Sequence, residues 1–107
     1  MPEVQTSQFN GEMTQRFIEF IMMQAQQAAI FLGRLPSPQS GRTELNLPVA
    51  GMIINQLEMI REKTRGNLNH EETEILSSIL ADLRTTHLQL IDSARLASVP
   101  GSGGSPS

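Results

Sequence analysis

The chain has no cysteine, no tryptophan and no tyrosine among its 107 residues, and its only lysine is Lys63. The absence of cysteine excludes disulfide bonds and thiolate chemistry, and it is compatible with a reducing cytoplasm. A single domain of this size buries only about 60–65% of its unfolded surface. Its stability therefore depends on how well its apolar side chains are packed.

Positive charge is also scarce. Eight basic residues face eleven acidic ones, which gives a formal net charge of −3 at pH 7. An electrostatic field of this sign repels a phosphate backbone, so general nucleic-acid binding is disfavoured.

Long hydrophobic runs are missing as well. The most apolar segment, residues 13–32, is interrupted by Arg16, Glu19 and several glutamines, so it is too polar to span a bilayer. Residues 1–11 are polar and lack the basic start of a secretory signal. We therefore expect a soluble, cytoplasmic protein without a transmembrane segment.

Apolar side chains recur at three- and four-residue spacings in three segments, a pattern typical of amphipathic helices. The sequence predicts an all-α fold with long helices at about residues 13–32, 48–65 and 70–93, which together form one domain over 13–93. The core face of the first helix is predicted to hold Phe17, Phe20, Ile21, Ala25, Ala28, Phe31 and Leu32. The stripes of the other two are Ala50, Ile53, Ile54, Leu57 and Ile60, and Leu76, Ile79, Leu80, Leu83, His87, Leu90 and Ile91.

The segments outside these helices are rich in residues that disfavour regular structure. Residues 1–12 are expected to form a flexible arm, and residues 94–107 a disordered tail rich in Pro, Gly and Ser. Residues 33–46 contain several Gly and Pro and are expected to form a long loop.

Only a short turn separates the second and third helices, so these two should form an antiparallel hairpin. Lys63 lies in the last turn of the second helix, and Gly66 ends that helix. Asn69 is a good N-cap for the third helix, and Glu72 completes a capping box. The residues expected to build the turn are Lys63, Thr64, Gly66, Asn67, Leu68, Asn69 and Glu72.

Residues 13–32 carry more apolar side chains than the core of a small domain can cover. At about 100° per residue, Ile18, Met22 and Ala29 widen the apolar arc to roughly 200°, whereas about 100° suffices for a surface helix. The excess is expected to meet another copy of the chain or a partner. The residues predicted to mediate self-association are Phe17, Ile18, Phe20, Ile21, Met22, Gln24, Ala25 and Ala29.

Gln24 lies inside this apolar arc. A buried amide costs about 1–3 kcal/mol unless it finds a hydrogen-bond partner. Two arrangements would supply one: pairing with the same residue of a second copy, or a bond to a backbone carbonyl within the chain.

The residues that could carry chemistry do not form a recognisable catalytic or metal site. His70, Glu71 and Glu74 superficially resemble a helical zinc motif, but the second histidine is replaced by Glu74, and acidic residues in a first helical turn fit capping. His87 lies on the core stripe and is expected to be structural. We expect no enzymatic activity, no metal and no cofactor. The cluster Arg61, Lys63 and Arg65 precedes a helix N-terminus, but neighbouring glutamates disfavour an anion there.

Several motifs resemble one small bacterial family. They are Phe17-x-x-Phe20, a Gln/Ala-rich helix ending Phe31-Leu32-Gly33, Pro36-x-Pro38, Asn46-Leu47, and Glu62-Lys63-Thr64-Arg65-Gly66-Asn67-Leu68 followed by Glu71-Glu72. That family is the domain of unknown function with number eighteen-forty-four. The resemblance covers about residues 15–90 and implies a short, helical, cytoplasmic bacterial protein with no assigned activity. Members commonly have an acidic residue where this chain has Asn55, and many have Tyr at or near His87.

These observations favour a small helical module for homo-oligomerisation or protein interaction, whose partner is itself or another protein. One alternative is an RNA- or ribosome-associated factor. Its contacts would come from Arg34, Arg42, Arg61, Lys63 and Arg65. Another alternative is a peripheral membrane protein that uses residues 13–32, although interfacial helices usually carry more Lys and Arg on the polar face.

Overall fold

The computed structural model describes residues 2–98, and it places side chains from residue 11 to residue 97. These described residues are mostly helical and form three helices: α1 (Pro2–Phe31), α2 (Leu47–Lys63) and α3 (His70–Ser98). Two short strands, β1 (Leu32–Pro36) and β2 (Thr43–Leu45), lie between α1 and α2. The sequence predicts an all-α fold, and the two strands show that the fold is not purely all-α.

Two helix boundaries differ from the prediction. α1 begins at Pro2 rather than near residue 13, and α3 continues to Ser98 rather than ending near residue 93. Both extensions lack an apolar stripe, which is the signal that periodicity detects. A helix that is already formed extends at little cost through such residues, because only its first turn is expensive to nucleate. The part of the predicted C-terminal tail beyond residue 98 lies outside the described residues.

The prediction of a long loop over residues 33–46 is wrong, because most of these residues belong to a β-hairpin. β1 and β2 are antiparallel, with Leu32 opposite Leu45 and Pro36 opposite Thr43. The Asn46 amide donates to the Phe31 carbonyl at 2.8 Å, so the hairpin closes next to the end of α1. Gly33, with a φ of 80°, allows the chain to leave the helix directly into the first strand.

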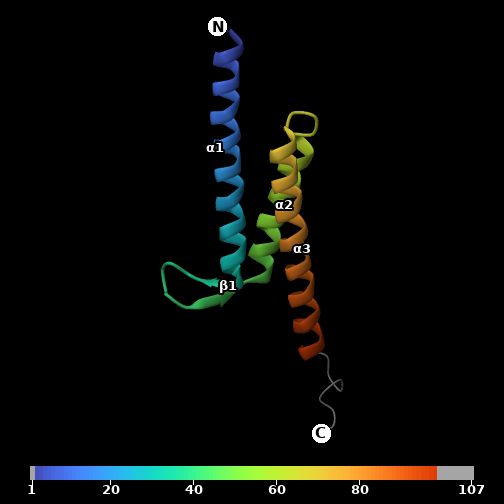
Figure 1. The fold of residues 1–107 in the computed structure, drawn as a ribbon. Coiled ribbons are helices and arrows are strands. Elements are labelled where there is room, and N and C mark those ends of the chain that lie inside the picture. Colours follow the sequence, from blue (N-terminus) through green and yellow to red (C-terminus); the bar gives the residue numbers. More distant parts are fainter. Residues whose placement is uncertain (1, 99–107) are drawn as a thin grey trace.

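The core forms where α1 lies against both α2 and α3 (Figure 1). Each helix contributes one line of buried side chains to it, as the spacing of apolar residues predicts for α2 and α3. The buried cluster consists of Ile21, Ala28 and Leu32 from α1 and β1, Ala50, Ile54 and Leu57 from α2, and Leu76, Leu80 and Leu83 from α3. Phe20 does not belong to this core, since 45% of it is exposed.

α2 and α3 lie side by side and are joined by a turn over residues 64–69 (Figure 1). Gly66 has a φ of 86°, a conformation that side chains other than glycine disfavour. Asn69 and Glu72 exchange the two hydrogen bonds of a capping box, each 2.8 Å long. The Asn69 side chain also donates to the Thr14 hydroxyl at 2.9 Å, which ties the turn to α1.

His87 holds the lower half of α3 against the start of α2. Its Nε2 lies 2.9 Å from the carbonyl oxygen of Leu47, and the ring packs over Gly51. A Cβ atom at position 51 would lie only 3.0 Å from His87 Cε1 and 3.1 Å from Nε2. His87 therefore acts as a packing and hydrogen-bonding residue that depends on glycine opposite it.

This arrangement predicts that the effect of Gly51→Ala depends on residue 87. Alanine is favoured over glycine in a helix interior by about 0.5–1 kcal/mol. In the parent chain the crowding against His87 should cancel this gain or reverse it. In a His87→Ala background the crowding is absent, so the substitution should stabilise the fold by about 0.5–1 kcal/mol in urea unfolding. Equal effects in both backgrounds would contradict the proposed packing.

Candidate functional site

The apolar excess of α1 is divided between two sides of the helix. Ile21 is 1% exposed, so it belongs to the core, and its predicted place in an interface is wrong. Successive residues of a helix are about 100° apart, so Phe20 and Met22 lie on opposite sides of Ile21. Both are exposed, at 45% and 53%. We call the side that carries Met22 the Met22 flank and the side that carries Phe20 the Phe20 flank.

The Met22 flank faces α3 and forms the wall of a shallow groove, the α1–α3 groove. Residues of α1 and α3 line three adjoining hollows along it. The apolar side chains of the groove are Ile18, Met22, Ala25 and Ala29 from α1, Leu35 from β1, and Ile75 and Ile79 from α3. Three residues predicted for self-association, Ile18, Ala25 and Ala29, are half-buried here.

Carboxylates border the upper part of this groove. Glu19 and Glu71 line the hollow nearest the turn, and Glu74 lines the middle one. Glu19 accepts a hydrogen bond from Gln15 at 3.3 Å, and Glu74 lies 3.2 Å from His70. Among the described side chains, no Arg or Lys is within ion-pair distance of these three carboxylates. The border is therefore acidic.

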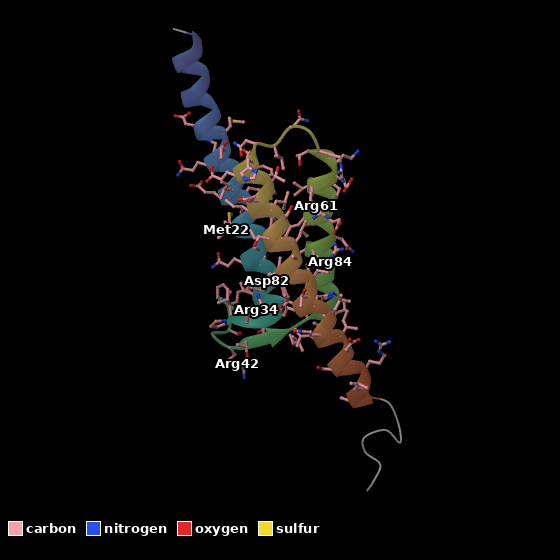
Figure 2. The ribbon with its side chains drawn as sticks, turned by 45° about the vertical axis from the view of Figure 1, so that its right-hand side comes forward. Met22, Arg34, Arg42, Arg61, Asp82 and Arg84 are labelled. Carbon is pink, nitrogen blue, oxygen red and sulfur yellow. The ribbon has the colours of Figure 1, made fainter. Side chains whose placement is uncertain are left out.

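An ion pair closes the lower end of the groove (Figure 2). Arg34 of β1 donates from Nη1 to Asp82 Oδ2 at 2.8 Å and from Nη2 to Oδ1 at 3.3 Å. The Thr86 hydroxyl accepts a further hydrogen bond from the same guanidinium. This contact fixes the β-hairpin against α3, and the hydrogen bond from Arg34 lowers the pKa of Asp82.

The Phe20 flank lies on the other side of α1, away from α3. Met13 and Met23 share it and are 46% and 62% exposed. Phe17 and Gln24 lie nearer the core and are half-buried. Because Gln24 keeps contact with solvent, its amide does not carry the full cost of burial that the sequence suggested.

The five basic residues considered for RNA binding are not gathered in one place. Arg34 and Arg42 lie at the hairpin end of the molecule, whereas Arg61 lies towards the opposite end of α2 (Figure 2). Arg34 pairs with Asp82, Arg61 with Glu58, and Arg65 with Glu62. Carboxylates thus neutralise much of this charge, and the described residues offer no continuous basic surface.

Other chemical candidates also remain separate. Within the described part of the chain, no group of three or more His, Cys, Asp or Glu side chains comes together that could hold a metal ion. None of the helices over residues 2–98 has the length and apolar character needed to cross a membrane. The histidine at position 87 serves the contact between α2 and α3 described above.

The comparison with protein families identifies the chain. The family model of a domain of unknown function, DUF1844, matches residues 14–89. The chain belongs to the DUF1844 family. Neither curated proteins nor solved structures give a significant match. The DUF1844 match covers α1 from Thr14, both strands, α2 and most of α3, so it includes the groove and the turn.

Two parts of the groove in this DUF1844 chain were not predicted from its sequence. Ile75 and Ile79 complete its α3 side, and only Ile79 was predicted, as a core residue. Arg34 and Asp82 are 48 positions apart and meet only because the β-hairpin returns Arg34 to α3. Nothing in the local sequence around either residue signals this contact.

The ion pair predicts a pH-dependent stability. Because the pKa of Asp82 is lower in the folded chain than its ordinary value of 3.8, ionised Asp82 stabilises the fold. This contribution should be complete above pH 3.8 and disappear as the pH falls through the folded-state pKa. Asp82→Asn should therefore be less stable than the parent at neutral pH, and the difference should shrink below pH 3.8.

The measurement is urea unfolding of both chains between neutral and acidic pH. Arg34→Gln provides the matched variant, because it removes the other partner of the pair. Adding Asp82→Asn to Arg34→Gln should cause little further loss. Additive losses, or a difference that grows on acidification, would show that the ion pair does not couple β1 to α3.

Proposed function

We propose that this domain is a protein-interaction module that assembles with a second copy through the Phe20 flank of α1. The observation that carries the proposal is the exposure of Phe20, at 45%, in the middle of α1 and directly beside the core residue Ile21. Aromatic and methionine side chains are enriched in protein interfaces, and Met13 and Met23 extend the same exposed stripe.

A second copy suits this flank because the surface does not repel itself. In a two-fold arrangement each side chain meets its symmetry-related surroundings on the other copy. If two α1 helices cross antiparallel with Phe20 at the centre, Arg16 lies opposite Gln24 and Met13 lies opposite Gln27. No pair of like charges then meets along the stripe. The half-buried amide of Gln24 also gains a position from which it can hydrogen-bond across the contact.

A binding role rather than an enzymatic one is part of this proposal. It is supported by the contacts of His87, whose Nε2 lies 2.9 Å from the Leu47 carbonyl and whose ring lies over Gly51. A histidine held in this way contributes to packing between helices, and it is not poised beside a nucleophile.

The test is the mass of the chain in solution. The parent chain at micromolar concentration should elute, with light-scattering detection, at about twice its 11.8 kDa mass. Phe20→Glu should elute as a monomer, because a carboxylate at the centre of the contact would lose hydration without gaining a partner. Leu88→Glu on α3 is the matched control, because Leu88 is similarly exposed, at 55%.

Leu88→Glu should keep the assembly, and both variants should retain the circular dichroism of the parent. A parent chain that remains monomeric would contradict the proposal. A Phe20→Glu variant that still assembles would show that another surface is used.

A further inference from the structure

The α1–α3 groove has the dimensions and surface of a site for one helix. From Ile18 to Ala29 its α1 wall extends over about three helical turns, or roughly 16 Å. Ala25 and Ala29, which line the lowest hollow, and Ser78, which lines the middle one, have small side chains, so another backbone can approach closely. Met22 lies in the middle and is 53% exposed. Such an apolar channel between two helices is the type of surface into which amphipathic helices insert.

The charges at the border determine which helix fits. Glu19, Glu71 and Glu74 stand along the upper part of the groove, and no described Arg or Lys pairs with any of them. At the lower end Asp82 is already neutralised by Arg34. The unneutralised charge around the channel is thus negative, and an approaching helix with basic flanks would be attracted to it.

We propose that the α1–α3 groove binds an amphipathic helix of another protein, with an apolar stripe flanked by Lys or Arg on both sides. The apolar stripe packs on Met22 and Ile79, and the basic side chains reach Glu19, Glu71 and Glu74. The groove disfavours a second copy of this chain, since its exposed helix surfaces would bring further glutamates to an acidic border. The same border repels phosphate groups of nucleic acids and of anionic lipids.

This site is independent of the self-association proposed above. The Met22 and Phe20 flanks lie about 200° apart around α1, so each can be occupied while the other is altered. Failure of either proposal therefore leaves the other to be tested separately.

The probe is a synthetic fluorescein-labelled helical peptide with leucines at i, i+3, i+4 and i+7 and lysines on both flanks. A second peptide has glutamate at every lysine position. We expect the lysine peptide to bind the full chain at least about tenfold more tightly in fluorescence anisotropy at low salt. Added salt should reduce this difference, because screening weakens charge pairing. Equal binding of both peptides would overturn the proposal.

Two pairs of matched variants locate the binding. Met22→Lys should weaken binding of the lysine peptide at least about tenfold. Met59→Lys should leave this binding unchanged, although it places the same charge at a methionine that is similarly half-exposed. Glu74→Lys should likewise weaken binding more than Glu44→Lys, which changes the net charge equally but lies in β2. Similar losses within each pair would indicate attraction to the overall charge and would overturn the assignment to the groove.

The oligomeric state of the same variants separates the two proposals. Phe20→Glu should bind the lysine peptide as the parent does, even where it has lost self-association. Met22→Lys should bind the lysine peptide more weakly, and its mass in solution should remain that of the parent assembly. If Phe20→Glu loses peptide binding and Met22→Lys binds the peptide as the parent does, the peptide binds the Phe20 flank. This result would overturn the groove assignment.

Discussion

The packing of α1 against both α2 and α3 along a single narrow line is the contact on which the rest of the structure depends. Ile21 and Ala28 are almost fully buried on that line, and Leu32 continues it into β1. Ala28 and Ala50 are small and fully buried members of the same core cluster, which allows α1 and α2 to approach closely. A line this narrow secures α1 but leaves both of its sides outside the core.

The two sides of α1 acquire different surroundings from this one contact. On the Met22 side, α3 runs alongside and supplies a second wall with acidic residues at its border. The β-hairpin closes the end of that channel, because Arg34 binds Asp82 and Thr86 on α3. On the Phe20 side, the side chains of Phe20, Met13 and Met23 stay exposed. One helix therefore presents two separate exposed apolar surfaces.

Much of this fold was predictable because helices repeat their contacts at a short, regular spacing. The buried stripes of α2 and α3, the Asn69–Glu72 capping box and the positive φ of Gly33 and Gly66 all follow from local sequence. The β-hairpin was not predictable, since its strands are short and contain Gly33 and Pro36, which disfavour strands. It forms through contacts distant in sequence, such as Asn46 to Phe31 and Arg34 to Asp82.

The excess of apolar residues in α1 was visible in the sequence. Its distribution between a Met22 flank and a Phe20 flank was not. Periodicity placed Phe20 with Ile21 on one face, because an apolar arc of about 200° has no marked centre. Only the positions of α2 and α3 show that Ile21 is the centre and that Phe20 and Met22 are its two sides. The candidate surfaces therefore depend on tertiary packing, although Phe20 and Met22, the central residues of the two flanks, were in the predicted set.

The proposed assembly depends on apolar surface of α1 that its own chain leaves exposed and that a second copy would cover. Thermal unfolding of the parent chain over a hundredfold range of protein concentration tests it most directly, because an assembly is stabilised by mass action and a monomer is not. Self-association predicts a Tm that rises steadily with protein concentration. A Tm that stays constant over the whole range would contradict it.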